Sequence, residues 1–580
     1  MLPAVLPAAF PLVVALVFQA GAALRSPEFQ PASATSPADS QRTLRNARSA
    51  QANFERTRRA NLPIENGGSS GRCDVRVGRF CYWWDDGEFP PTPEPPKTKA
   101  ARVALLERLA QGAKRVPGDG WIAGQRVRYL VEDGRAADAA IAAAECRAEA
   151  WWCAALAGFA YHAAQDFARA DSAFDAALTA MPEATRCRWT DISLLLDGDV
   201  RKRYERSPCS ERGSFESRFW ALSRPLYLLP ANDLRTEHFA RLTMAELIRT
   251  SRYPHQLPWG DDSQELLVRY GWETGWTRTP PSMYTSGDVH VVGHEPTPAF
   301  DFVPDWDVLA SPDSAEDADW ALHDPLAQSR YAPRYARSVG ALDHQIAFFR
   351  RGDSAVVLAA FDARTQTGFE RDTIDAALAI APPEAPDSVS ITSDTLAARR
   401  HVLMMPTAWQ PRIVSVEARD SAARRVARVR AVARPPTSSG RVTMSDLLLF
   451  DDPSSLPASL DEAMPRARGT SRVERSKPVG VYWEMYGVNP VGDTLSYQLT
   501  VVREGKSWLR RAAERLGVVE RRLPVRMEWN EPTARPGAAR SRALALDFST
   551  LPEGRYRIEL TLEAANQTVA TAVREVEVEK

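Results

Sequence analysis

The sequence predicts a multidomain protein in which helices form the N-terminal half and antiparallel β-strands form the C-terminal half. Between residues 99 and 200, alanine-rich segments carry apolar residues at the i, i+3 and i+4 spacing of amphipathic helices. From about residue 340 onward, apolar and polar residues alternate over short runs, as in strands with one buried face. A chain of 580 residues, 44% of them hydrophobic, is long enough for several domains with their own cores.

The charge balance excludes two classes of partner. The 73 Lys and Arg residues nearly cancel the 74 Asp and Glu residues. A protein that binds nucleic acid or an anionic membrane through its overall field carries an excess of positive charge. We therefore expect neither partner.

The first residues resemble an export signal. Residues 1–24 carry no charge, residues 12–18 are apolar, and Ala20-Gly21-Ala22 matches a small-residue cleavage site. We predict a signal peptide over residues 1–22. The alternative is a retained membrane anchor, although Pro3, Pro7 and Pro11 make a poor spanning helix.

The cysteines support export. All six fall within residues 73–209, in three pairs that are close in sequence. Such an even, clustered set is typical of disulfides in an oxidising compartment. The expected pairs are Cys73–Cys81, Cys146–Cys153 and Cys187–Cys209. Free buried thiols are the alternative.

Residues 23–98 read as a connecting region. Residues 23–72 are rich in Ser, Ala, Gln and Arg, which predicts a disordered tail with a short helix over residues 40–59. A small disulfide-closed loop with Tyr82, Trp83 and Trp84 follows. The proline-rich run over residues 90–96 then predicts a stiff linker.

The helical domain is expected over residues 99–209, and part of it resembles the tetratricopeptide repeat. Six positions carry the resemblance: Gly158, Tyr161, Ala170, Phe174, Ala177 and Pro182. The small residues let two antiparallel helices touch, and the aromatic rings fill the space between them. A weaker copy lies 31 residues earlier. In the repeat frame Phe159 and His162 face the concave groove, where they contact either a partner peptide or a neighbouring domain of the same chain.

Residues 210–335 predict a small α+β module. An amphipathic helix over residues 233–250 precedes a turn rich in Pro and Trp. The short apolar run at residues 265–270 then reads as a buried strand that ends at Gly271. Two antiparallel β-sandwiches are expected after the module, over residues 336–475 and 476–580.

Motifs for common chemistry are absent from the sequence. There is no G-x-S-x-G elbow, no H-E-x-x-H, no Walker loop and no G-x-G-x-x-G, so no cofactor is expected. His290 and His294 have the i, i+4 spacing of metal ligands on a helix, but the valines between them favour a strand, so no metal site is expected. The best catalytic candidates are Asp261, Asp262 and Glu265, because paired acids beside aromatic residues serve glycoside hydrolysis.

One further motif resembles the GWxTD-domain family. Pro258-Trp259-Gly260-Asp261-Asp262, seven residues and then Tyr270-Gly271 follow that family's pattern of G-W-x-T-D and Y-G. Trp259, Asp262, Tyr270 and Gly271 fall on the family's motif positions, and Glu237 on the preceding helix resembles its upstream acidic position. The family is bacterial, typically exported and of unestablished activity. The resemblance implies a location in the periplasm or at the cell-envelope surface.

These patterns lead to one functional expectation and two alternatives. We expect a non-catalytic envelope protein that binds another protein or a peptide as a scaffold, with Trp259–Gly271 serving the fold. The first alternative is an envelope hydrolase that acts on glycans through Asp261, Asp262 or Glu265. The second is a secreted carbohydrate-binding protein that uses some of the 16 tryptophans.

Overall fold

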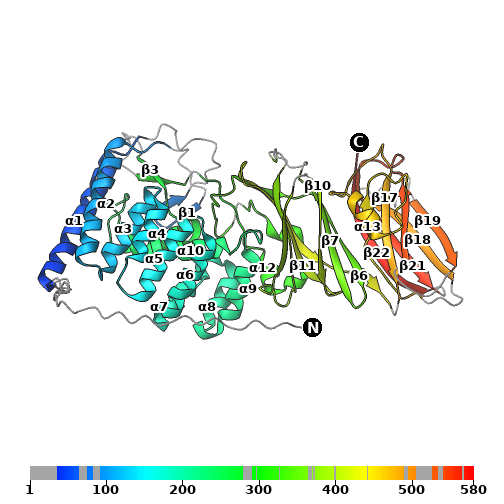
Figure 1. The fold of residues 1–580 in the computed structure, drawn as a ribbon, viewed down its shortest axis with the longest axis horizontal. Coiled ribbons are helices and arrows are strands. Elements are labelled where there is room, and N and C mark those ends of the chain that lie inside the picture. Colours follow the sequence, from blue (N-terminus) through cyan, green and yellow to red (C-terminus); the bar gives the residue numbers. More distant parts are fainter. Residues whose placement is uncertain are drawn as a thin grey trace, which may run out of the picture.

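The computed structural model describes most of the chain. Its described residues are 36–64, 75–82, 92–278, 291–295, 297–324, 327–363, 369, 373–396, 400–439, 442–488, 494–504, 525–532, 540–564 and 567–580. Most of the helices gather at one end of the molecule and the larger sheets at the other (Figure 1). The predicted order of helices before strands is therefore correct.

The helical half is a series of antiparallel and crossing helices (Figure 1). Their bounds are α1 Pro37–Ala60, α2 Pro96–Arg115, α3 Gly120–Glu132, α4 Ala136–Ala144, α5 Ala150–Ala163, α6 Phe167–Ala180, α7 Glu183–Thr190, α8 Gly198–Arg206, α9 Gly213–Ser223, α10 Asp233–Arg249, α11 Asp261–Tyr270 and α12 Trp306–Ala310. Capping side chains and a proline mark the ends of helices. Asp166, for example, caps α6 by accepting a hydrogen bond from the N–H of Arg169, and Pro182 follows the end of that helix.

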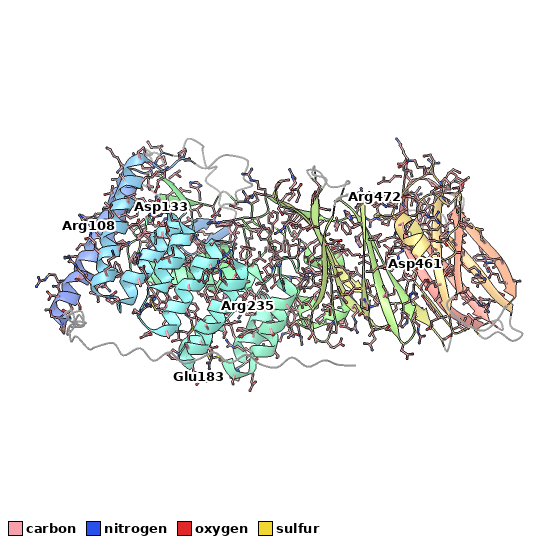
Figure 2. All side chains as sticks on the ribbon, in the orientation of Figure 1. Arg108, Asp133, Glu183, Arg235, Asp461 and Arg472 are labelled. Carbon is pink, nitrogen blue, oxygen red and sulfur yellow. A yellow bond between two sulfur atoms is a disulfide. The ribbon has the colours of Figure 1, made fainter. Side chains whose placement is uncertain are left out.

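Helices α5 and α6 pack at the positions that the sequence suggested. Phe174 is fully buried, and a Cβ on Gly158 would lie 2.7 Å from its ring. The absence of a side chain at Gly158 is therefore what lets the ring approach α5. Arg235 at the start of α10 reaches Asp175 of α6 at 2.5 Å, which ties the next long helix to this pair (Figure 2).

The short helix predicted over residues 40–59 is present, and it extends over residues 37–60. These residues form α1, and its inner face carries buried charged groups that pair with α3. Arg58 donates to Glu132 at 2.6 Å, and the hydroxyl of Tyr129 donates to Glu55 at 2.6 Å. Because a buried charge without a partner is strongly destabilising, these partners fix α1 against the helical half.

The predicted strand at residues 265–270 is wrong, because this run is the second half of α11. The helix shares one hydrophobic core with α5 and α10. Residues 99–209 and 210–335 therefore do not form separate cores. The small sheet of this region pairs β3, Gly275–Arg278, with β4, Val291–His294, so His294 lies on a strand as predicted.

Two sheets follow the helices. The first has three strands in the order β10-β7-β6, and the second has five in the order β5-β12-β11-β8-β9. Their bounds are β5 Ser338–Ala341, β6 His344–Arg351, β7 Ser354–Asp362, β8 Ile374–Ala381, β9 Ser390–Leu396, β10 Arg400–Thr407, β11 Arg412–Asp420 and β12 Arg425–Ala433. Side chains from both sheets, such as Phe348 and Leu378, meet in one hydrophobic cluster.

Buried charges join the helical half to the five-stranded sheet. The guanidinium group of Arg430 on β12 donates to the carbonyls of Leu222 and Arg224 at the end of α9, at 3.0 and 2.9 Å. Glu417 on β11 accepts the N–H of Leu228 at 2.9 Å and pairs with Arg430 at 3.4 Å. These charged groups are fully buried, so the sheet and the helices share an interior and are not loosely linked.

The last two sheets have the orders β13-β22-β21-β18-β19, with β16 beside β22, and β14-β17-β15, with β20 beside β17. The strands from residue 437 onward pair within these sheets. The C-terminal β region therefore begins near Thr437, and the predicted boundary at residue 476 is wrong. The bounds are β13 Thr437–Ser438, β14 Thr443–Met444, β15 Leu448–Phe450, β16 Arg472–Glu474, β17 Val479–Tyr486, β18 Thr494–Arg503, β19 Val525–Pro532, β20 Arg540–Leu546, β21 Gly554–Ala564 and β22 Gln567–Glu579; helix α13, Leu460–Ala463, lies between β15 and β16.

Several sequence predictions lie outside the described residues. They are the signal peptide at residues 1–22, the Trp83–Trp84 part of the aromatic loop, Cys73 and the side chain of Cys81. The described part of the loop forms a hairpin of β1, Val75–Val77, and β2, Phe80–Tyr82. Within the described ranges, no helix has the length and hydrophobicity that a membrane span requires.

Candidate functional site

A buried cluster of polar side chains lies where α5, α10 and the end of α11 meet. Glu237 is at its centre. One carboxylate oxygen lies 2.7 Å from Nε2 of His162, and the other accepts a hydrogen bond from Nε of Arg241 at 2.7 Å. Glu237 and Arg241 face each other because they are four residues apart on α10. His162 comes from α5, so this contact joins two helices that are distant in sequence.

Both ring nitrogens of His162 have oxygen partners, since Nδ1 lies 2.9 Å from the hydroxyl of Thr236. Burial alone would raise the pKa of Glu237. The positive charge of Arg241 and the contact with His162 outweigh it and lower that pKa to about 2. Glu237 is therefore a carboxylate held by its partners, and it has no free proton to give.

Arg241 completes the cluster by holding the end of α11. Its Nη1 donates to the carbonyls of Val268 and Arg269, both at 3.0 Å, and its Nη2 donates to the carbonyl of Arg330 at 2.8 Å. The last carbonyls of a helix lack intrahelical partners and attract cations. Gly271 follows with φ at +89°, which lets the chain turn away directly after the helix.

A cavity beside this cluster has a volume of about 40 Å³. Pockets that enclose small-molecule ligands are roughly ten times larger, about 300–1,000 Å³. The cavity is of a size for ordered water. Its walls include, besides the cluster, Gln165, Phe167, Tyr270, Trp272, Glu295, Tyr331 and Arg334.

The groove predicted at Phe159 and His162 is not open to a partner. Phe159 is fully buried, with its ring 5.5 Å from that of Trp272 in an edge-to-face contact. His162 is covered by α10 through Glu237. Of the two alternatives for these residues, a partner peptide is wrong and a neighbouring part of the same chain is correct, because residues 233–272 supply the apolar and charged groups that fill the groove.

The four motif positions lie around the ends of α11. Trp259 precedes the helix and is half-buried against the main core, near the ring of Tyr253. Tyr270 is buried at its end and stacks on Tyr82, with ring centroids 4.3 Å apart. Gly271 makes the turn described above.

Asp262, near the start of α11, holds the β1–β2 hairpin. Its carboxylate accepts hydrogen bonds from Nε and Nη2 of Arg79, at 2.6 and 2.7 Å, and from the backbone N–H of Arg79 at 3.1 Å. These hydrogen bonds keep the pKa of Asp262 well below its usual range. Its partner Arg79 lies 183 residues earlier in the sequence.

The three candidate catalytic carboxylates do not converge. Asp261 is exposed, Asp262 is bound to Arg79, and Glu265 pairs with Arg269 on its own helix at 2.7 Å. Glycoside hydrolysis needs two carboxyl groups that face one another across a substrate. Within the described residues, no group of three or more His, Cys, Asp and Glu side chains could hold a metal ion.

Sequence reasoning missed Arg241 and Arg79, which bind the end and the start of α11. The i, i+4 spacing from Glu237 was a signal for Arg241. For Arg79, the sequence holds no comparable signal, because the contact depends on how the hairpin docks on α11.

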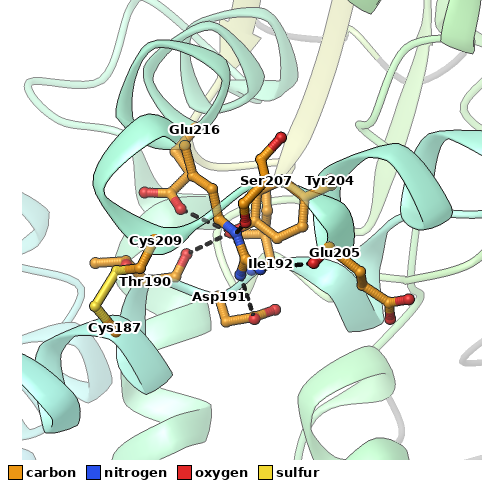
Figure 3. Close-up of a disulfide and its surroundings, with 10 residues drawn as sticks. Cys187, Thr190, Asp191, Ile192, Tyr204, Glu205, Ser207, Cys209 and Glu216 are labelled. Carbon is orange, nitrogen blue, oxygen red and sulfur yellow. Dashed lines mark hydrogen bonds and ion pairs between the residues drawn. A yellow bond between two sulfur atoms is a disulfide. The ribbon is translucent and has the colours of Figure 1, made fainter.

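Two of the three predicted disulfides are present, Cys146–Cys153 and Cys187–Cys209. The second joins α7 to the turn after α8 (Figure 3). Beside it, the hydroxyl of Tyr204 donates to Glu216 at 2.7 Å, and Arg212 pairs with Asp191 at 2.7 Å. The two disulfides fit an extracellular protein.

Comparisons with known proteins leave the chain without an established family. No family model and no curated protein matches the sequence. Among solved structures, red sea bream transglutaminase aligns with 45% of this chain and 37% of its own, at 12% identity and a TM-score of 0.13. The FN1-FN3 domains of chicken CNTN1 align with 43% of this chain and 70% of their own, at 12% identity and a TM-score of 0.14. Such low scores support no inference about function.

Proposed function

We propose that this chain is an exported bacterial envelope protein that acts as a scaffold, binding another envelope protein or a peptide. The observation that carries the proposal is how its chemically capable side chains are used. His162, Glu237, Arg241 and Asp262 each contact a group on another element of the fold. They stabilise the packing of helices and hairpin, and the cavity beside them is of a size for water.

We also propose that α3 to α6 are two tetratricopeptide-like repeats. Helices α3 and α4 start at Gly120 and Ala136, which is 30 and 31 residues before α5 and α6 start. That offset supports a repeated helical pair, and the Gly158–Phe174 contact is the small-against-large packing that the repeat uses. Repeats of this kind present surfaces to other proteins.

The β-rich half supports the same function. We interpret its sheets as two successive sandwiches, since hydrophobic side chains of facing sheets meet in common clusters. The buried bonds of Arg430 and Glu417 hold the first of them against the helices. A long molecule can present binding surfaces that lie far apart, which is what a scaffold requires (Figure 1).

Cross-linking in the native envelope tests this function. The full-length tagged protein is cross-linked in cells, purified and analysed by mass spectrometry. We expect one or a few partners in near-stoichiometric amounts, and we expect their loss in Phe174→Ala, whose helical half is destabilised. Recovery of the chain without a partner, or with the same partners whether or not the helical half is folded, would contradict the proposal.

A further inference from the structure

A second, larger depression opens next to the buried cluster, at the junction of the two halves. It has a volume of about 590 Å³, which is in the range of small-molecule sites. Gln165 in the α5–α6 turn forms one side, Arg334 and Tyr335 a second, and Arg419, Ser421 and Arg424 around the β11–β12 turn a third. We name it the junction cleft. It shares Gln165 and Arg334 with the walls of the small cavity.

The junction cleft gathers positive charge that its own walls do not neutralise. Within the described part of the chain, Arg334 and Arg424 have no carboxylate partner, whereas Arg419 pairs with Asp375 at 2.9 Å. Arg337 adds a further guanidinium group beside Arg424. Partial burial, and then repulsion from Arg337 and Arg334, lower the pKa of Arg424. Cations held together against repulsion are relieved when an anion binds among them.

Backbone bonds hold the arginines in this arrangement. The guanidinium group of Arg424 donates to the carbonyl of Arg334, and the N–H of Arg337 donates to the carbonyl of Arg424 at 2.6 Å. The segment around residues 334–337 is therefore fixed to the β11–β12 turn. The remaining N–H groups of Arg334 and Arg424 stay available to a ligand, because a guanidinium group has five.

Two residues that line the cleft have long side chains although their backbone lies in the left-handed region that favours glycine. Arg424 has φ of +53° and Gln165 has φ of +60°. Non-glycine residues in this left-handed region reduce the stability of the fold. Both turns would form more easily with glycine, so the two polar side chains are kept at a cost to stability.

We propose that the junction cleft binds a small molecule through a phosphate group. The fork of N–H donors on arginine matches phosphate oxygens, and a dianion balances the unpaired charges of Arg334 and Arg424 where a single carboxylate balances one. The cleft is larger than inorganic phosphate. The ligand is therefore an organic phosphomonoester, and its phosphate group is the part that the arginines bind. This site is independent of whether the chain also binds a protein.

Calorimetry on the full chain tests the site with two probes, inorganic phosphate and glycerol 3-phosphate, and with acetate as the carboxylate comparison. We expect glycerol 3-phosphate to bind more tightly than phosphate, and acetate to bind at least tenfold more weakly than either. Raising the NaCl concentration weakens both phosphate probes. Equal binding of all three anions would contradict the proposal, as would no binding of phosphate at millimolar concentrations.

Two variants and a matched control locate the site. Arg424→Gly removes the side chain and relaxes the turn, so the protein stays folded while the affinity for glycerol 3-phosphate falls at least tenfold. Arg334→Gln, at an exposed position, gives a similar loss. Arg108→Gln changes an exposed arginine on α2, far from the cleft, and leaves the affinity unchanged (Figure 2). Unchanged affinity in both cleft variants, or an equal loss in all three, would overturn the assignment.

Discussion

The guanidinium group of Arg241 packs against Gly271, on the side where any other residue would carry its Cβ. A Cβ at Gly271 would come within 3.3 Å of Nη2 of Arg241, the atom that donates to the carbonyl of Arg330. The turn after α11 and the buried cluster around Glu237 therefore depend on one another, and a side chain at position 271 would disturb both.

Gly271→Ala tests this dependence. The backbone at φ +89° and ψ −177° is favourable only for glycine, so alanine costs about 1–3 kcal/mol from strain alone. Gly275→Ala is the matched control, since a Cβ at that position would meet no atom within 4 Å and its φ is not positive. Denaturant unfolding should show a loss for position 271 and little change for position 275. Equal stability of the two variants would contradict the coupling.

Phe174 tests the packing of α5 on α6. Phe174→Ala removes a fully buried ring and should lower the free energy of unfolding by about 3–5 kcal/mol. Gly158→Leu should be comparably damaging, because a side chain there must displace that ring. Ile141→Ala, at an exposed position of α4, is the control and should change stability by less than about 0.5 kcal/mol. Wild-type melting in the first two variants would refute the packing.

The buried carboxyl group of Asp233 should make the free energy of unfolding depend on pH. Burial raises its pKa to about 6, even though the hydroxyl of Tyr335 donates to it at 2.8 Å. Because the folded-state pKa is above the unfolded value near 3.8, this group's contribution to stability is complete below pH 3.8 and is lost as the pH rises through 6. The lost contribution is on the order of 2–3 kcal/mol.

Asp233→Asn keeps an acceptor for Tyr335 and cannot titrate. The difference in unfolding free energy between wild type and this variant should therefore change between pH 4 and pH 6, in favour of the variant at the higher pH. Other buried acids affect both proteins alike and cancel in the difference. A difference that is constant over this range would show that Asp233 is not protonated in the folded protein.

The disulfides should stabilise the helical half by different amounts. In the chain-entropy model, closing the loop between Cys187 and Cys209 contributes about 3 kcal/mol, and closing the shorter Cys146–Cys153 loop contributes about 2 kcal/mol. Replacing each pair with serine and measuring urea unfolding compares them. The reverse order of losses would contradict this account. Peptide mapping of protein from its native host should recover both bonds, and free thiols there would contradict export.

The broad division into helices and strands could be predicted because periodicity is a local property. Strands β5 to β22 all lie in the β-rich region expected from residue 336 onward. One local prediction failed. The run at residues 265–270, which forms the end of α11, is short and apolar, so its composition does not distinguish a strand from a helix.

The site was harder to predict because its contacts are long-range. The motif residues Tyr270 and Gly271 were found from sequence, but the partner of Glu237 is His162, on a helix 75 positions earlier. Likewise the short helix α1 was predicted but its packing was not, because the residues that neutralise Arg58 and Glu55 lie on α3. A sequence shows which groups carry charge, and only the fold shows which charges meet.

The central claim is that the segment from Trp259 to Gly271 serves the fold and not catalysis, and Asp262 gives its most direct test. The measurement is the free energy of unfolding of Asp262→Ala and Asp262→Asn, with Asp261→Asn as an exposed neighbouring control, alongside an assay of glycan cleavage by each protein. We predict that the alanine variant is the least stable, that the asparagine variant is intermediate because it keeps an acceptor for Arg79, and that no variant alters glycan cleavage. Unchanged or increased stability in Asp262→Ala, together with loss of a wild-type glycan-cleaving activity, would contradict the account.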